Sequence, residues 1–411
     1  MADNDATATR RTANLVLVLL FFAGVITPCL GTILRLQTGG IAGENRPMAR
    51  RPSFAVGPRQ LPRQIDAWFN DHFGFRNLLV EAHGLIAYGV FGVSSSPDVV
   101  PGRDGWLFYA ADRIVESRRG LLPFRREELA AWQAKLEERR DWLAARRIRY
   151  VFTVAPEKSS LYAELLPPAL QPVGGQTRAD QLLAWMRAHS TVEIVDLREA
   201  LRAAKAVDRI YHRTDTHWND LGAFAAYRSL AEWMQGPFPM VRPLDAGEFD
   251  RQVRITPAGD LAGMLALMPL LSEARIALVP KTPSPLVARD PTAIMKRRTY
   301  LPHQEPKVFA CPSGEIASAV VVHDSFVLPM RPFLARHFRR STFLHAVFAP
   351  EVIAAERPDL VIEEMVERVL SRPGFLPASE LATFDAADGS QPVAGGTIGS
   401  ASPTSAVADE H

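Results

Sequence analysis

The fold is indicated most clearly by Ala319-Val-Val-Val-His-Asp-Ser-Phe326, in which an apolar run ends in an acidic residue and a serine. Short, uninterrupted apolar runs are typical of strands buried on both faces of a parallel sheet. In such sheets, ligands bind beyond the carboxyl ends of the strands. The stretch therefore predicts a parallel sheet with Ser325 at the edge where a binding site would form.

Helical and strand-like patterns alternate around this stretch. Amphipathic spacing indicates helices, and short apolar runs indicate strands. Their alternation predicts an α/β domain with a mainly parallel sheet. The expected helices cover residues 127–147, 177–189, 220–234 and 363–370, and the expected strands cover 150–155, 192–196, 343–348 and 359–362. We expect the Pro-rich residues 237–312 to form an irregular insertion.

The N-terminal part of the chain contains an uncharged apolar run, residues 13–34, directly after Arg10, Arg11 and Thr12. At 1.5 Å per residue it is long enough to cross a hydrocarbon core of about 30 Å. Because basic residues favour the cytoplasmic side, the run predicts one membrane anchor with the rest of the chain exported. A cleaved signal peptide is the alternative, although no clear cleavage site follows the run.

The chain thus divides into five expected parts. The linker is rich in Gly, Pro and Arg, and the C-terminal tail is rich in small polar residues, so neither has the apolar periodicity of a packed element. We expect a cytoplasmic N-terminus at residues 1–12, a transmembrane anchor at 13–35, a linker at 36–60, the α/β domain at 61–385 and a disordered tail at 386–411.

The overall composition excludes several classes of protein. A formal net charge of +2 over 411 residues is far below that of a typical nucleic-acid-binding protein, so we expect no nucleic-acid partner. The two cysteines, Cys29 and Cys311, cannot supply a disulfide framework or a cysteine-rich zinc site.

Thr214-Asp-Thr-His-Trp-Asn219 supplies the groups that a serine nucleophile needs. Serine is a weak nucleophile unless a base accepts its proton, and the base needs an orienting group. We predict a triad in which His217 takes the proton of Ser325 while Asp215 holds the other ring nitrogen. The backbone N–H of Ser325 would then face the developing oxyanion.

Other interpretations of these residues remain open. An Asp-Ser pair after a strand can cap a helix, and Asp215 and Asn219 could be turn or cap residues. His217 could be a structural histidine. Our prediction is that the protein uses no metal and no cofactor, but a metal centre is an alternative. Its candidate ligands are His212, Asp215, His217 and His323.

A series of motifs in a fixed order resembles a known family. The chain resembles the SGNH-hydrolase-like acetyltransferases of exopolysaccharide biosynthesis, namely the alginate O-acetylation proteins of the AlgJ and AlgX type. The motifs are Asn70-Asp-His-Phe-Gly-Phe-Arg76, Gly102-Arg-Asp-Gly-Trp-Leu-Phe-Tyr109, Ala155-Pro-Glu-Lys-Ser-Ser-Leu-Tyr162, Thr214-Asp-Thr-His-Trp-Asn219, His323-Asp-Ser-Phe326 and Arg357-Pro-Asp-Leu-Val-Ile-Glu-Glu-Met-Val-Glu-Arg368.

The resemblance implies a three-layer SGNH-hydrolase-like domain with a circularly rearranged motif order, because Asp215 and His217 precede Ser325. It implies the same triad, and an acyl-serine intermediate that passes acetyl to hydroxyls of a secreted polysaccharide. The implied location is the periplasm, with one helix in the inner membrane. The implied partner is a membrane-bound acyltransferase that delivers the acetyl group.

The side-chain part of the oxyanion hole is not identified by any motif. Asn219, Lys158 and Asp324 are the candidate substrate or oxyanion residues, and Lys158 matches a Pro-x-Lys motif of the family. Two other functions fit the same sequence. One is a polysaccharide acetylesterase with the same triad, and the other is a non-catalytic scaffold or polysaccharide-binding subunit of an export complex.

Overall fold

The computed structural model describes residues 2–34, 36, 48–54, 57–300, 304–345, 348–372, 381 and 384. Its centre is a seven-stranded sheet with the strand order β4-β3-β11-β9-β10-β8-β7. The links from β4 through β10 are parallel, whereas β8 and β7 are antiparallel. The strands are β3 Arg149–Ala155, β4 Ile194–Val195, β7 Val287–Arg289, β8 Lys307–Ala310, β9 Ile316–His323, β10 Phe338–His345 and β11 Leu360–Val366. The prediction of an α/β fold with a mainly parallel sheet is confirmed.

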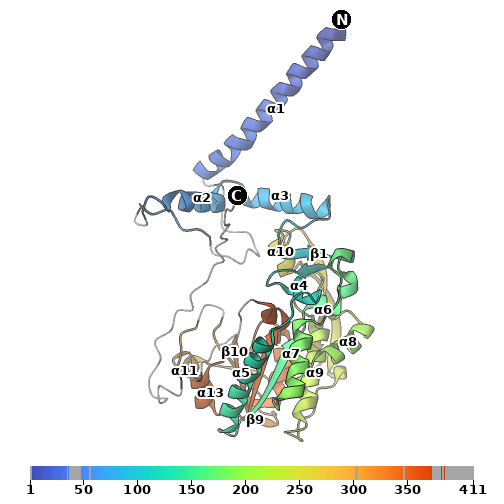
Figure 1. The fold of residues 1–411 in the computed structure, drawn as a ribbon, viewed down its shortest axis with the longest axis vertical. Helices are drawn as coiled ribbons and strands as arrows, with labels where there is room; N and C mark the ends of the chain where they lie inside the picture. The colour runs from blue at the N-terminus through green and yellow to red at the C-terminus, as the bar shows by residue number, and fades with distance from the viewer. Residues whose placement is uncertain are drawn as a thin grey trace.

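Helices cover both faces of this sheet and make three layers (Figure 1). On one face lie α8 Arg198–Val207, α9 Asp220–Met234 and α12 Val327–Leu334. On the other lie α5 Arg126–Ala144, α7 Arg178–His189 and α13 Pro350–Glu356. The short helices α4 Ile114–Arg118 and α6 Lys158–Leu161 and the small sheet of β1 Val99–Pro101 and β2 Leu107–Tyr109 complete this part of the body.

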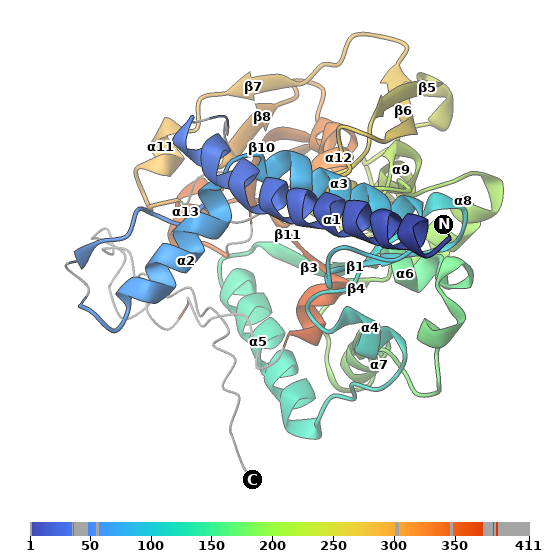
Figure 2. The same ribbon diagram turned by 90° about the horizontal axis from the view of Figure 1, so that it is seen from above.

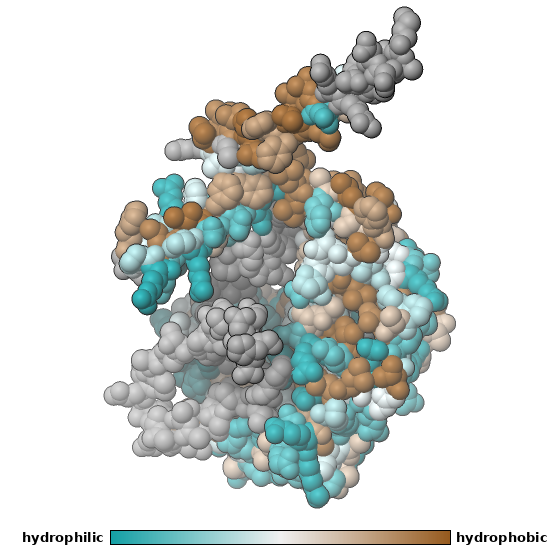
Figure 3. Space-filling view, turned by 45° about the horizontal axis from the view of Figure 1, so that its top comes forward, coloured by the Kyte–Doolittle hydropathy of each residue, from teal (hydrophilic) through white to brown (hydrophobic). Residues whose placement is uncertain are grey.

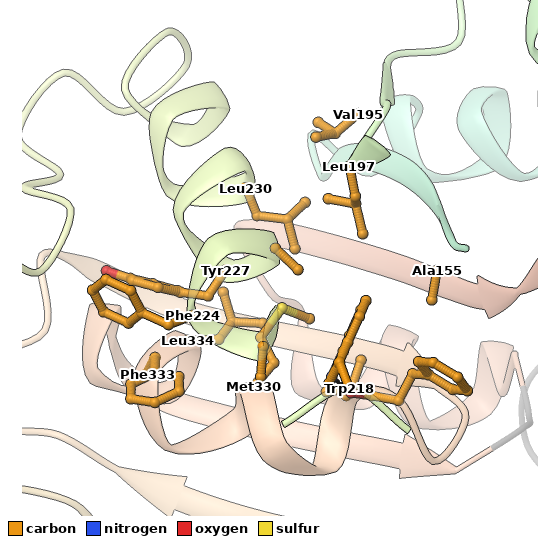
Figure 4. Close-up of a cluster of buried hydrophobic side chains, with 14 of the residues drawn as sticks. Ala155, Val195, Leu197, Trp218, Phe224, Tyr227, Leu230, Met330, Phe333 and Leu334 are labelled. Carbon is orange, nitrogen blue, oxygen red and sulfur yellow. Dashed lines mark hydrogen bonds between the residues drawn. The ribbon is translucent and has the colours of Figure 1, made fainter. Parts of the chain in front are cut away.

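The central strand β9 explains why its sequence is apolar throughout. Successive side chains of a strand point to opposite faces. Ala319 and Val321 pack into one core cluster, and Val320 and Val322 pack into the other. Figure 4 shows the first cluster, in which the aromatic and aliphatic side chains of α9 meet those of α12. Its labelled residues are Ala155, Val195, Leu197, Trp218, Phe224, Tyr227, Leu230, Met330, Phe333 and Leu334.

The prediction of a helix at residues 363–370 is wrong. The chain continues as β11 to Val366 and then forms a 3₁₀ turn, Glu367–Ser371. Glutamate favours helices by intrinsic propensity, but pairing with β3 and β9 decides the conformation here. Glu363 is buried, forms an ion pair with Arg139 of α5, and accepts a 2.7 Å hydrogen bond from Tyr150 of β3.

The Pro-rich residues 237–312, which we expected to be irregular, contain several regular elements. A long antiparallel hairpin joins β5 Phe249–Pro257 to β6 Ser272–Pro280, with the short helix α10 Asp260–Met264 between its strands. The helix α11 Thr292–Met295 follows β7, and β7 and β8 extend the main sheet. This segment is therefore part of the fold, and α10 and β6 also contribute to the site.

Three helices precede the body. α1 Ala2–Ile33 contains a 22-residue stretch, Thr12–Ile33, that is long and apolar enough to cross a membrane by length and composition. α2 Leu61–His72 and α3 Arg76–Gly89 lie across the end of α1, between that helix and the body (Figures 1 and 2). The tail expected at 386–411 and most of the expected linker lie outside the described residues.

Candidate active site

The segment between Tyr211 and Trp218 forms a tight loop that carries two of the predicted triad residues. An isolated bridge pairs Tyr211 with Trp218, and the His212 N–H donates to the His217 carbonyl at 3.2 Å. The buried ammonium of Lys158 lies inside the loop and donates to three of its carbonyl oxygens. These belong to His212 at 3.1 Å, Arg213 at 3.1 Å and Asp215 at 2.8 Å. Lys158 therefore holds the loop in shape.

Ser325 lies between the carboxyl end of β9 and the start of α12. The preceding Asp324 fixes this turn, because its carboxylate accepts from the N–H of Phe326 at 2.9 Å and from the N–H of Val366 at 2.6 Å. The Asp324 N–H in turn donates to the Glu364 carboxyl at 3.0 Å. The serine is thus held at the edge of the two central strands, β9 and β11.

The two segments meet although 108 residues separate His217 from Ser325. Nε2 of His217 lies 2.8 Å from Oγ of Ser325, and Nδ1 lies 2.7 Å from Oδ1 of Asp215. This arrangement fits an imidazole that donates from Nδ1 to the carboxylate and accepts the serine proton at Nε2. The structure therefore brings together Asp215, His217 and Ser325 in one hydrogen-bonded chain.

Apolar packing fixes the contact between the segments. Phe326, directly after the nucleophile, lies against the His217 ring with a centroid distance of 4.9 Å. The fully buried Trp218 donates its indole N–H to the Phe326 carbonyl at 3.0 Å. Because each neighbour of the triad is anchored to the other segment, the His217–Ser325 distance does not depend on the triad hydrogen bonds alone.

Asp215 is held by three donors. Its Oδ1 accepts from the His217 side chain and also from the His217 backbone N–H at 3.1 Å, and its Oδ2 pairs with Arg275 of β6 at 3.1 Å. Burial opposes ionisation of this carboxyl, but the hydrogen bonds and charge of His217 outweigh it and hold its pKa well below the ordinary value. Asp215 is therefore a carboxylate at neutral pH.

His217 responds in the opposite direction. Burial lowers its pKa, but the Asp215 hydrogen bond and charge outweigh burial, and Asp260 adds to them, so the pKa is raised above that of a free imidazole. Asp260 of α10 lies 3.9 Å from Nδ1 and accepts from the N–H and hydroxyl of Thr216 at 2.7 and 2.5 Å. Such an imidazole is a strong base, although a larger fraction of it is protonated in mild acid.

The other sequence candidates have different positions. The Asn219 side chain caps α9: its oxygen accepts from the N–H groups of Leu221 and Gly222, and its amide donates to the Arg209 carbonyl at 2.6 Å. Lys158 and Asp324 support the backbone of the loop and of the serine turn. The contacts of all three side chains therefore support the backbone. Among the hydrogen bonds of the described residues, none joins one of these side chains to Ser325.

The histidines of the metal alternative are not gathered in one place. Among the described residues, the group close enough to share an ion is Asp215, His217 and Asp260. His217 Nδ1 and Asp215 already bond to each other, and His217 Nε2 faces Ser325. His323 instead lies buried against His345, and burial lowers its pKa to about 4.

Three residues near the triad were not found from the sequence. Arg275 and Asp260 come from the segment expected to be irregular, where no motif identifies them. Arg368 follows β11 and is largely buried. It pairs with Glu157, and its guanidinium lies over the Tyr109 ring at 4.4 Å and 5.6 Å from the centre of the Phe326 ring. Only its place at the end of the last family motif could have indicated it.

A protein-family model matches part of the chain that carries this site. Residues 99–300 match the family model described as an SGNH hydrolase-like domain, acetyltransferase AlgX. The matched residues include Asp215 and His217, and Ser325 lies beyond them. The resemblance to the SGNH-hydrolase-like O-acetyltransferases is confirmed.

Relatives with similar sequences carry the name probable alginate O-acetylase AlgJ. That of Azotobacter vinelandii is 26% identical over 270 residues, which are 64% of this chain and 63% of the relative. That of Pseudomonas aeruginosa is 26% identical over 256 residues, which are 61% of this chain and 60% of the relative. The matched region therefore spans somewhat less than two thirds of these relatives.

Two solved structures are similar to part of this chain. The O-acetyltransferase domain of Pseudomonas putida AlgJ is 21% identical, with a TM-score of 0.45, over 70% of this chain and 98% of that domain. Bacillus cereus PatB1 with a sulfonyl adduct is 16% identical, with a TM-score of 0.49, over 66% of this chain and 97% of that protein.

Proposed function

We propose that this protein is a serine-dependent O-acetyltransferase that transfers acetyl to hydroxyl groups of a secreted polysaccharide. The observation that carries the proposal is the continuous chain of contacts from Asp215 through His217 to Ser325, at 2.7 and 2.8 Å. The family of the domain and the names of the AlgJ relatives support acetyl as the transferred group. The names of the same relatives support a polysaccharide acceptor.

In the first step, an acetyl ester or thioester donor acylates Ser325. His217 Nε2 removes the hydroxyl proton while Oγ attacks the carbonyl carbon, and the imidazolium that forms is stabilised by Asp215. As the tetrahedral intermediate collapses, the bond to the donor's leaving group breaks, and His217 returns the proton to that group. The products are acetyl-Ser325 and the protonated leaving group.

In the second step, a sugar hydroxyl attacks acetyl-Ser325. His217 removes the proton of the incoming hydroxyl, and the same proton then restores the Ser325 hydroxyl as the ester bond to Oγ breaks. Water competes for the same intermediate, and its attack would give acetate. The split between transfer and hydrolysis therefore depends on the acceptor and on how well water is excluded.

Negative charge on the tetrahedral intermediate needs donors that are already in place. Ser325 lies two residues before α12, which begins at Val327, so the partial positive charge of that helix terminus lies near the reacting carbon. We propose the Ser325 backbone N–H as one oxyanion donor. The Asn219 amide is not proposed for this role, because it already donates to the Arg209 carbonyl.

We propose that the body lies in the periplasm and that α1 anchors it in the inner membrane. The apolar stretch Thr12–Ile33 and the preceding Arg10 and Arg11 support this orientation. A membrane-bound acyltransferase is the proposed source of acetyl, since a tethered periplasmic enzyme would meet a donor that emerges from the bilayer.

The test measures where the acetyl group goes. The detergent-solubilised full chain is incubated with a chromogenic acetyl ester and an acetyl-free acidic polysaccharide, beside the Ser325→Ala variant. Acetyl esters on the polysaccharide with the wild type and not with the variant are the expected result. Release of acetate alone, at a rate that the polysaccharide does not change, would identify an esterase. Acetylation that continues in Ser325→Ala would overturn the proposed mechanism.

A further inference from the structure

The helices α2 and α3 lie at the C-terminal end of α1, and we call this pair of helices the shelf. The turn between them is hydrogen-bonded to α1. The Gly74 N–H, between α2 and α3, donates to the Pro28 carbonyl at 3.2 Å and lies 2.8 Å from the Thr32 hydroxyl. A Cβ on Gly74 would lie only 2.3 Å from the Gly31 backbone, so the two glycines allow backbone-to-backbone contact. The shelf is therefore fixed to the last turns of α1.

This contact sets the depth of the shelf if α1 crosses a bilayer. The stretch Thr12–Ile33 has 22 residues, which at 1.5 Å each span about 33 Å and match a hydrocarbon core of about 30 Å. Pro28 and Thr32 lie within its last six residues, so they are within about 8 Å of the end of the span. The α2–α3 turn must then lie at the edge of the hydrocarbon core.

The surface of the shelf suits that depth. Leu78, Leu85 and Ile86 of α3 are exposed and, at spacings of seven and eight residues, share one face of the helix. Ile65 and Phe69 of α2, four residues apart, are exposed in the same way. Figure 3 shows hydrophobic surface continuing from α1 onto the helices at its foot. No described residue covers these side chains.

The opposite side of α3 packs on the body. A Cβ on Gly84 would lie 2.2 Å from the Leu265 carbonyl, which follows α10, and Ala87 is buried on the same side. α10 begins with Asp260, which holds Thr216 beside His217. A short series of contacts thus connects the shelf to the catalytic loop.

Basic side chains in the α2 region favour lipid as the occupant. Arg51, Arg59 and Arg63 are exposed in α2 and the segment before it. Arginines on the polar side of a helix whose other side is apolar are typical of helices that lie in the headgroup region, where phosphates accept their hydrogen bonds. A water-exposed shelf would leave both the apolar face and its depth at the end of α1 without explanation.

We propose that α2 and α3 lie flat in the headgroup region of the leaflet where α1 ends, and that this shelf holds the catalytic loop at a fixed height facing the membrane. The inference rests on the proposed membrane anchor and goes beyond the proposed chemistry. A donor group carried at the membrane surface would then be met by a site that cannot rotate away from it.

The test uses the full chain in lipid nanodiscs, with spin labels on single cysteines. Cys29 is replaced by serine, and Cys311 stays because it is fully buried. Labels go on Leu78 and Leu85 of the shelf, on Leu30 of α1 as the lipid reference, and on Val207 of α8, which is 88% exposed, as the water reference. The measurement is accessibility to oxygen, which concentrates in lipid, relative to a water-soluble nickel complex.

We expect the shelf labels to favour oxygen, as the Leu30 label does, while the Val207 label favours nickel. Shelf labels that behave like Val207, or that are shielded from both reagents, would overturn the proposal. A Leu30 label exposed to nickel would overturn it as well, because the depth argument needs α1 in the bilayer. The Ser325→Ala protein should give the same accessibilities, so this result is independent of the proposed chemistry.

Discussion

Replacing Asp215 with asparagine separates the two contributions of this residue to the triad. The carboxylate accepts from His217 at Oδ1 and from Arg275 at Oδ2. An asparagine side chain can accept at only one of these positions. If its oxygen stays with Arg275, its NH₂ faces Nδ1, and the imidazole must carry its proton on Nε2, where it cannot accept from Ser325.

The expected loss follows from this tautomer. An imidazole with the wrong nitrogen protonated loses about four decades of kcat in a serine triad. At about 1.36 kcal/mol per decade, this corresponds to about 5.4 kcal/mol of transition-state stabilisation. The alternative rotamer keeps the tautomer but turns its NH₂ toward the Arg275 guanidinium, which removes an ion pair and places two donors together.

The pH dependence supplies a second, independent readout. Activity requires neutral His217, so it falls as pH decreases through the raised pKa of that group. Without the Asp215 charge, burial, which lowers the pKa of His217, is the largest remaining influence. The acidic limb of the residual kcat–pH profile should therefore move to lower pH in the variant, although the rate itself is much smaller.

The assay is the release of chromophore from an acetyl ester, followed from pH 5 to 9 with the full chain. Asp260→Asn is the matched control, because Asp260 is farther from Nδ1, at 3.9 Å, and its contacts are with Thr216. It should lose less than about tenfold in rate, since an exposed or half-exposed charge at that distance contributes little. Equal losses in the two variants, or an unmoved acidic limb in Asp215→Asn, would refute the reasoning.

Three further changes test other parts of the account. Lys158→Met should leave three loop carbonyls without their donor and lower the free energy of unfolding, measured by denaturant titration, by about 3 kcal/mol. An unchanged denaturation midpoint would contradict the proposal that the Lys158 ammonium holds the loop. Arg139→Met should lower the free energy of unfolding by about 3–5 kcal/mol, because it leaves the buried Glu363 without its ion-pair partner. The double variant with Glu363→Leu should recover most of that loss. A double variant as unstable as the single one would argue against the pair. Arg275→Met should lower kcat about tenfold, because Arg275 holds Asp215. Arg254 is its exposed cross-strand neighbour, and Arg254→Met should change kcat by less than about twofold. Similar effects of the two changes would exclude a positioning role for Arg275.

Much of the fold could be predicted because local patterns and final structure agree in the central elements. The helix expected at 220–234 is α9, Asp220–Met234, where the apolar spacing and the Asn219 cap give the same boundary. The apolar run before Asp324 is strand β9, which is buried on both faces. The triad residues lie directly beside these two elements, Asp215 and His217 before α9 and Ser325 after β9, so the site could be predicted from the sequence.

The errors came from residues whose environment is set by distant parts of the chain. Glu363 and Glu364 have high helix propensity, but they lie in a strand because the β3 and β9 pairings and the buried Arg139 accommodate them. The Glu364 carboxyl illustrates the same point, since burial raises its pKa well above the ordinary value and the Asp324 charge adds to this. No local pattern predicts such a partner.

Arg275 and Asp260 were missed for a related reason. They lie 60 and 45 residues after Asp215, in a segment whose proline content obscures its hairpin. Their contacts with the triad loop follow from how that hairpin and α10 fold back over it. Only the tertiary structure reveals that this segment contributes to the site.

The serine triad is tested by locating the acetyl group after a short incubation of the full chain with a chromogenic acetyl ester. The reaction is quenched in acid and the peptides are mapped by mass spectrometry, with His217→Ala treated in parallel. We expect an added acetyl group on the peptide that contains Ser325 in the wild type and a large decrease of it in the variant. Turnover with no acetyl on Ser325, or acetylation that His217→Ala leaves unchanged, would contradict the serine triad.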